Sequence, residues 1–249
     1  MPARPAWPPK SAPRLFVDGP LGAGQPVRLR EEHAHYLARV MRVAPGDTVI
    51  LCDDETGEWA ATVSAAGRRE VTLDLVEKLR AREAVPDLWL CPAMLKKDRF
   101  DLVLEKTTEL GVAVIQPVVT RRCVADKLNG ERARRIVTEA AEQCARTALP
   151  EVREAISLDA LLKEWPEDRA LFFADEEGGE PALAAFASGG DKAAILTGPE
   201  GGFDPAEREA IRAHPQARAI SLGPRILRGE TAAIAALSLW MAAAGDWHK

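Results

Sequence analysis

"ILTGPEGGFDPAERE" at Ile195–Glu209 and "SLGPRILRGETAA" at Ser221–Ala233 are built alike. Each passes from an apolar segment through Gly-Pro into the start of an expected helix, and we refer to them as the first elbow and the second elbow. In the first elbow, Asp204 suits a helix N-cap, Pro205 the first helical turn, and Glu207 the third position after the cap. The first elbow is therefore expected to join a strand end to a helix start.

The residues of the elbows restrict the ligand that they could hold. Gly198, Gly201 and Gly202 permit positive φ and a close approach to the backbone, although a tight turn without a ligand would use them equally well. Neither phosphate pattern, GxxxxGK[ST] or an early GxGxxG, is present. Glu200 and Glu230 place carboxylates where a helix start would otherwise attract phosphate. A neutral or cationic ligand is favoured, and S-adenosylmethionine, with its adenine and sulfonium, fits this description.

The composition limits the class of protein. The 249 residues are 47% hydrophobic and 29% charged, which predicts a globular fold with a substantial core. The net charge of -5 argues against coating nucleic acid by electrostatics alone, but a local basic face is compatible with it. No apolar run approaches the roughly 20 residues of a membrane span, and no secretory h-region begins the sequence, so a cytoplasmic protein is expected. The four cysteines lack metal-ligand spacing, so neither a metal site nor a disulfide framework is expected.

The pattern divides the chain into two regions. After a Pro-rich leader over 1–13, residues 14–80 contain short β-rich runs, interrupted by the helical stretch "EEHAHYLARVMRV", and predict a small barrel. Over 84–249, beyond a charged linker, strands such as "VAVIQPVVT" alternate with helices, which predicts a parallel α/β sheet with ligands at the carboxyl ends of its strands. The last helix, "ETAAIAALSLWMAAAG", is apolar almost all round and needs a partner inside the domain or across a dimer interface.

The paired elbows resemble the signature of the SPOUT methyltransferases, most closely the RsmE family, which methylates N3 of a uridine in 16S ribosomal RNA. "HYLARVMRVAPGD", "EKTTELGV", "RRC" and "AAEQCAR" also resemble segments of that family, in family order. The resemblance implies an N-terminal PUA-like β-barrel and a SPOUT α/β domain with a C-terminal trefoil knot. It also implies S-adenosylmethionine bound in the knot, a homodimer, and 16S rRNA or the small ribosomal subunit as partner.

Two alternatives stay open beside this interpretation. The chain could be a SPOUT methyltransferase for another rRNA or tRNA site, or a non-catalytic RNA-binding assembly factor; "RRC" and "EQCAR", with the N-terminal barrel, favour the first interpretation over shorter tRNA-type members. One departure from the family is Gly229 in "LRGET", where the family usually has Thr. Any role carried by that side chain is therefore in doubt.

Candidate residues follow from the resemblance and from the chemistry of the imide N3–H. The guanidinium groups of Arg228 and Arg225 would stabilise a uracil anion, and Glu230 or Glu200 would accept the proton, unless Arg228 and Glu230 form only a structural ion pair. Cofactor contacts are expected from Thr197, Gly198, Pro199, Glu200, Gly201, Leu222, Gly223, Ile226, Leu227, Arg228, Thr231 and Ala232. RNA contacts are expected from Arg14, Arg39, Arg42, Arg121, Arg122 and Lys127, although surface arginines are often simply solvated.

Overall fold

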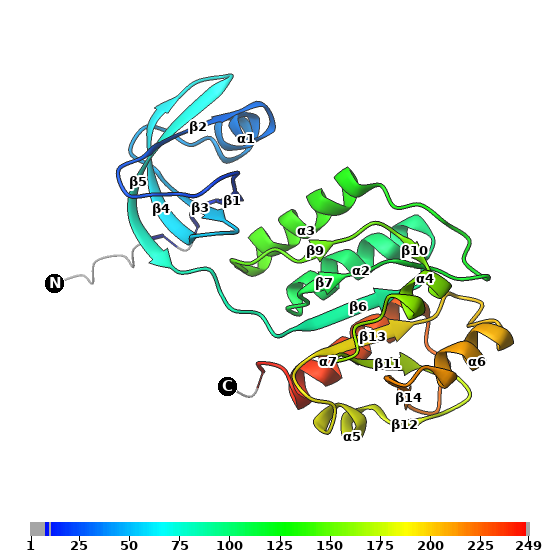
Figure 1. Ribbon diagram of the computed structural model, residues 1–249. Coiled ribbons are helices and arrows are strands. Elements are labelled where there is room, and N and C mark those ends of the chain that lie inside the picture. Colours follow the sequence, from blue (N-terminus) through cyan, green and yellow to red (C-terminus); the bar gives the residue numbers. More distant parts are fainter. Residues whose placement is uncertain (1–7, 10, 248–249) are drawn as a thin grey trace. The chain divides into compact units, whose positions relative to one another are not determined.

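The chain folds into two compact units. Unit 1 comprises the residues up to Ala84 together with Ala141–Ala148, and unit 2 comprises Val85–Ala140 and the residues from Leu149 onward. The computed structural model (Figure 1) describes residues 8–9 and 11–247, so residues 1–7 and 10 of the expected leader lie outside the described residues. The domain limits expected from the sequence, 14–80 for the barrel and 84–249 for the α/β domain, remain a prediction.

Unit 1 is built on a five-stranded sheet in the order β1-β3-β4-β5-β2. Strand β1 runs parallel to β3, and the other neighbours are antiparallel. Alternate side chains such as Val49, Leu51, Leu73 and Leu75 are buried in one core. The strands are β1 (Arg14–Phe16), β2 (Pro26–Arg30), β3 (Thr48–Asp53), β4 (Gly57–Ala66) and β5 (Glu70–Arg80).

The helical stretch of unit 1 is not a regular α-helix throughout. Helix α1 (Glu31–His35) continues as the π-helix η1 (Tyr36–Met41), which ends at Arg42 with a left-handed φ of 55°. Leu37 is fully buried, whereas Val40, three residues later at helical spacing, is 60% exposed. The wider π turn changes which side chains share a face, which a pattern of 3.6 residues per turn does not anticipate.

Unit 2 is a seven-stranded parallel sheet in the order β12-β14-β11-β13-β6-β7-β9, as expected for an α/β fold. The strands are β6 (Leu88–Pro92), β7 (Val114–Ile115), β9 (Glu151–Val152), β11 (Ala170–Ala174), β12 (Glu180–Pro181), β13 (Ala193–Thr197) and β14 (Ala217–Ser221). The single strand expected over "VAVIQPVVT" divides before Pro117, which cannot donate to a strand ladder. Its second half, β8 (Val118–Val119), pairs instead with β10 (Ile156–Ser157).

Helices cover both faces of this sheet, because successive strand side chains point to opposite sides. Phe172 and Ile195 belong to one core cluster, and their neighbours Phe173 and Leu196 belong to another. The first cluster includes side chains of α2 (Lys97–Glu109), α3 (Gly130–Cys144), α5 (Ala182–Ala187) and α7 (Gly229–Ala243). The second includes side chains of α4 (Leu158–Lys163) and α6 (Pro205–Ala213).

The last helix, α7, is buried along one side only. Ala233, Ala236, Leu237 and Trp240 are fully or almost fully buried in the core of unit 2. Other positions, among them Ile234, Ser238 and Leu239, are half-buried. Among the described residues, no helix is long and apolar enough to span a membrane.

Candidate active site

The site is assembled at the carboxyl ends of neighbouring parallel strands. Strand β13 ends at Thr197 and leads into the first elbow, and β14 ends at Ser221 and leads into the second. Strand β11 lies between them in the sheet. On the other side of β13, the amide of Ala93 after β6 donates a hydrogen bond to the Thr197 carbonyl at 2.8 Å. Connections thus leave four adjacent strands at one edge, which is where open α/β sheets bind ligands.

The first elbow is held by its own residues and by its neighbours. The predicted capping box is present: Asp204 accepts from the Ala206 amide at 3.1 Å, and the Glu207 carboxylate accepts from the Asp204 amide at 3.2 Å. Glu207 also accepts a 2.8 Å hydrogen bond from the amide of Arg121. The backbone hydrogen bond from Ala206, helped by the Arg121 guanidinium, lowers the pKa of the Asp204 carboxyl. The helix start is therefore fixed by local and long-range contacts together.

The two elbows meet at a pair of glycines. A Cβ atom added to Gly229, the first residue of α7, would lie 3.1 Å from the Gly198 carbonyl oxygen of the first elbow. It would also lie 2.8 Å from a terminal methyl group of Leu95, which precedes α2. The absence of a side chain at position 229 therefore allows close packing of both elbows against the start of α2.

A cation from α2 joins the carboxylates of the two elbows. Arg99 donates from Nη1 to Glu230 Oε1, and its Nε lies 4.0 Å from Glu200 Oε1. Arg228 does not form the ion pair with Glu230 that was considered from the sequence, because Arg99 takes that place. The Glu230 side chain is 11% exposed, and its Oε2 atom is buried without a hydrogen-bond partner in the described part of the chain.

The second elbow exposes much of its length. Gly223, with φ of 110°, has no atom within 4 Å of an added Cβ, and Ile226 is 92% exposed. Arg225 and Arg228 are exposed, and neither side chain pairs with another group among residues 8–9 and 11–247. Of the other predicted cofactor residues, Thr197 and Pro199 are buried, Leu222, Leu227 and Ala232 are half-buried, and Thr231 is exposed.

The predicted RNA-binding residues fall into engaged and free groups. Arg14 in unit 1 pairs with Glu58 and is 17% exposed. In unit 2, Arg121 pairs with Asp204 at 2.9 Å, and Arg122 donates to the Gly201 carbonyl at 2.8 Å. In the described residues the side chains of Arg39, Arg42 and Lys127 are exposed and have no such partner.

Several residues of the site were missed by the sequence interpretation. Arg99 and Leu95 lie beside the elbows, and Glu176, after β11, packs so closely on Gly202 that an added Cβ would collide with its carboxylate. The segment with Leu95 and Arg99 and the segment with Glu176 each follow a buried strand of the parallel sheet. This position is the feature of the sequence by which they could have been found.

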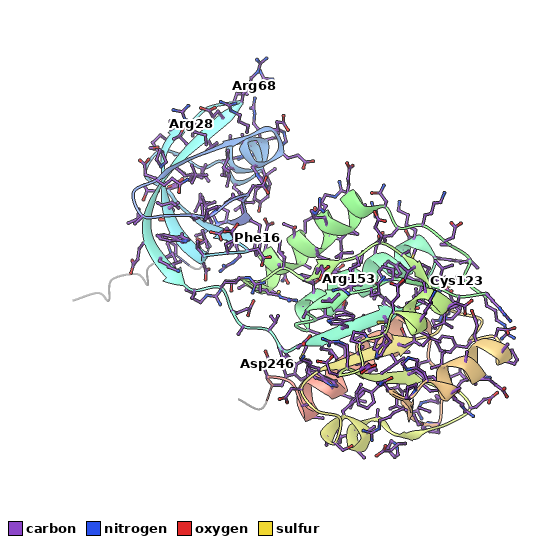
Figure 2. All side chains as sticks on the ribbon, viewed as in Figure 1. Phe16, Arg28, Arg68, Cys123, Arg153 and Asp246 are labelled. Carbon is purple, nitrogen blue, oxygen red and sulfur yellow. The ribbon has the colours of Figure 1, made fainter. Side chains whose placement is uncertain are left out.

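In unit 1, the side chains of Arg28 and Arg68 point outward in Figure 2, and the sequence interpretation did not single them out. The described residues hold no cluster of three or more His, Cys, Asp or Glu suited to a metal.

Comparison with known families covers most of the chain. Residues 82–241 match an RNA methyltransferase domain, and residues 29–76 match an RNA methyltransferase PUA domain. A ribosomal RNA small subunit methyltransferase E from Rickettsia conorii is 31% identical over 229 residues, covering 90% of this chain and 93% of the relative.

Solved structures agree with this comparison. A ribosomal RNA small subunit methyltransferase E from Neisseria gonorrhoeae, bound to S-adenosylmethionine, has a TM-score of 0.87 at 27% identity and covers 95% of this chain and 99% of its own. A methyltransferase from Legionella pneumophila with bound S-adenosylmethionine has a TM-score of 0.82 at 30% identity, covering 94% and 99%. With a PUA-type unit, a parallel α/β unit and both elbows in family order, the chain belongs to the ribosomal RNA small subunit methyltransferase E family of RNA methyltransferases.

Proposed function

We propose that this protein transfers the methyl group of S-adenosylmethionine to N3 of a uridine in the 16S rRNA of the small ribosomal subunit. The observation that carries the proposal is the junction of the two elbows, where Arg99 holds Glu200 and Glu230 beside Gly198 and Gly229. Family membership supports the reaction type and the class of RNA.

The residues at the junction fit the proposed cofactor. Backbone groups at Gly198 and Gly201 and the open space at Gly223 would admit an adenosine moiety, and Ile226 offers an exposed apolar side chain to cover it. The carboxylates of Glu200 and Glu230 suit a cationic ligand better than a phosphate. When bound, the cofactor supplies an electrophilic methyl group on a sulfonium.

The chemistry assigned to this chain concerns the target base. A uracil N3–H is weakly acidic, so the nitrogen becomes a good nucleophile as its proton leaves. Arg228 and Arg225, exposed and unpaired in the described residues, would stabilise the negative charge on the uracil oxygens. A carboxylate of the junction would accept the proton.

RNA binding is assigned to free cations in both units. Arg39 and Arg42 in unit 1 and Lys127 in unit 2 carry this proposal furthest, because their charges are not used by neighbouring carboxylates of the described chain. The target uridine must be unpaired or flipped, because N3 lies on its pairing edge.

The proposal also includes a homodimer and a knotted chain. The half-buried side of α7 supports a homodimer, since Ile234 and Leu239 would gain burial against a second copy. The trefoil knot remains an expectation of the family resemblance, and a cytoplasmic location remains an expectation from the sequence. Light scattering that gives a mass near 54 kDa, twice the 27.0 kDa of one chain, would support the dimer.

The function is tested by methyl transfer from labelled S-adenosylmethionine to naked 16S rRNA and to isolated small subunits, both from cells lacking the protein. Primer extension then maps the product, because a methyl group on N3 blocks base pairing. A single new stop at a uridine in 16S rRNA is expected. Transfer to tRNA or 23S rRNA alone would support a different SPOUT substrate, and binding without transfer to any RNA would favour a non-catalytic assembly factor.

A further inference from the structure

Arg99 of α2 contacts one acidic residue in each elbow. It lies in the first turn of α2, where its amide donates to the Lys96 carbonyl at 2.9 Å. From there its guanidinium reaches Glu230 by a direct hydrogen bond and approaches Glu200 at 4.0 Å. Glu200 and Glu230 are thirty residues apart in sequence, and both carboxylates lie within 4.0 Å of one guanidinium.

The contact uses only one oxygen of Glu230. Glu230 is 8% exposed, and Oε2 is a buried acceptor with no partner among the described residues. A buried carboxylate oxygen without a hydrogen bond is unfavourable, and a ligand donor would satisfy Oε2. Glu230 is also the second residue of α7, where the helix dipole favours a negative charge.

We infer that Arg99 is a positioning residue for methyl transfer, which orients the Glu230 carboxylate so that Oε2 accepts the imide proton of the target base. This inference rests on the proposed function. The N–H bond breaks as its proton moves to Oε2, and the electron pair left on the ring nitrogen forms the bond to the methyl carbon. The bond from that carbon to the sulfonium sulfur breaks at the same time, and its electron pair stays on sulfur in the departing neutral thioether. Arg99 touches neither reacting atom and acts through Glu230.

Three variants separate this role from a purely structural one. In Arg99→Met the cation is lost, in Arg99→Lys a shorter cation remains, and in Glu230→Gln the acceptor charge is removed. General bases contribute about 10²–10⁴-fold to rates, so misplacing Glu230 in Arg99→Met should lower the single-turnover rate at least about tenfold. Arg99→Lys should fall between this variant and wild type. Arg134→Met removes an exposed cation of α3 that has no partner among the described residues, and as the matched control it should keep the wild-type rate.

The deciding experiment is a double-mutant cycle on the full chain. Single-turnover methyl transfer at saturating RNA, S-adenosylmethionine affinity by calorimetry, and thermal midpoints are measured for wild type, Arg99→Met, Glu230→Gln and the double variant. If Arg99 acts through Glu230, the double variant loses no more rate than Glu230→Gln alone, within about twofold. The affinity for S-adenosylmethionine should then change less than about threefold in Arg99→Met.

Other outcomes overturn the inference in distinguishable ways. Additive rate losses, or a loss of cofactor affinity that matches the loss of rate, would show that Arg99 does not work through Glu230 on the base. If both Arg99 variants had a lower thermal midpoint but an unchanged rate per folded molecule, the role of Arg99 would be purely structural. If the wild type methylates no small-subunit RNA, the proposed function fails first, and the inference falls with it.

Discussion

The first and second elbows begin with the same Gly-Pro step and enter a helix, yet the structure uses them differently. In the first, Asp204 and Glu207 close a capping box, and Arg121 and Arg122 each add a hydrogen bond. In the second, Arg225, Ile226 and Arg228 are exposed. Within unit 2, one elbow is fixed by polar contacts and the other leaves these three side chains exposed.

The loops on either side explain this difference. The first elbow lies against Glu176, which packs on Gly202 and pairs with Arg208 of α6. The second elbow contains an internal 3.3 Å hydrogen bond from the Gly223 amide to Ser221 Oγ, and near its far end Glu230 accepts a hydrogen bond from Arg99. Similar motifs therefore do not imply similar roles. The loops that follow the neighbouring strands determine which polar groups of each elbow already have a partner.

The largest effect is expected at the second elbow. Arg228→Ala should lower the single-turnover rate by a hundredfold or more, since one charge-assisted contact made in the transition state is worth ~2.7–4 kcal/mol. The affinity for S-adenosylmethionine, measured by calorimetry, should change little. A near-normal rate on small-subunit RNA would make Arg228 structural and move the role to Arg225.

One glycine substitution in each elbow should distinguish an effect on stability from an effect on cofactor binding. Gly202→Ala should lower the free energy of unfolding by roughly 1–3 kcal/mol, because φ is 66° and the new Cβ would collide with the Glu176 carboxylate. Gly223→Ala has φ of 110° but no neighbour within 4 Å, so its loss of stability should be smaller. Its main effect should be weaker cofactor binding. Urea unfolding and calorimetry on both variants test this contrast, which equal stability losses would contradict.

The cap of the first elbow predicts a pH-dependent contribution to stability. The pKa of Asp204 is lowered from its ordinary value of 3.8, so its contribution is present above that value and is lost as the pH falls through the lower folded-state pKa. Wild type should thus be more stable than Asp204→Asn at pH 7, and the difference should shrink below about pH 4. Urea titrations at both pH values measure it. Asp191→Asn, at an exposed site with no partner among the described side chains, is the control.

The smallest effects should distinguish Arg122, which is hydrogen-bonded to the Gly201 carbonyl, from Lys127, which has no partner among the described residues. Lys127→Ala should lower the dependence of log K for RNA on log salt by about 0.7–0.9, the value for one lost phosphate contact. Arg122→Ala removes the hydrogen bond to Gly201 and should lower the thermal midpoint slightly while keeping the salt dependence. A reduced salt dependence in both variants would show that Arg122 also contacts RNA.

Much of the fold follows from local patterns. The alternation of buried side chains in β11 and β13, and the Asp204-Pro205 start of α6, depend on residues close together in sequence. Reliance on such local patterns also explains two errors. A single helix was expected where the π turn at Tyr36–Met41 occurs, and a single strand was expected where the chain divides before Pro117. In both places the sequence pattern is continuous, whereas the backbone geometry changes within it.

The α/β class of unit 2, both elbows and the acidic and basic residues available to them follow from the order of amino acids. Which of those residues meet depends on how the chain folds. With 33 basic and 38 acidic residues, no spacing rule could select Arg99 as the partner of Glu230. The choice depends on the order β11-β13-β6, which places the start of α2 beside the start of α7. Helix caps and strand alternation are set by chain neighbours, whereas an ion pair spanning 131 residues exists only after the sheet has assembled.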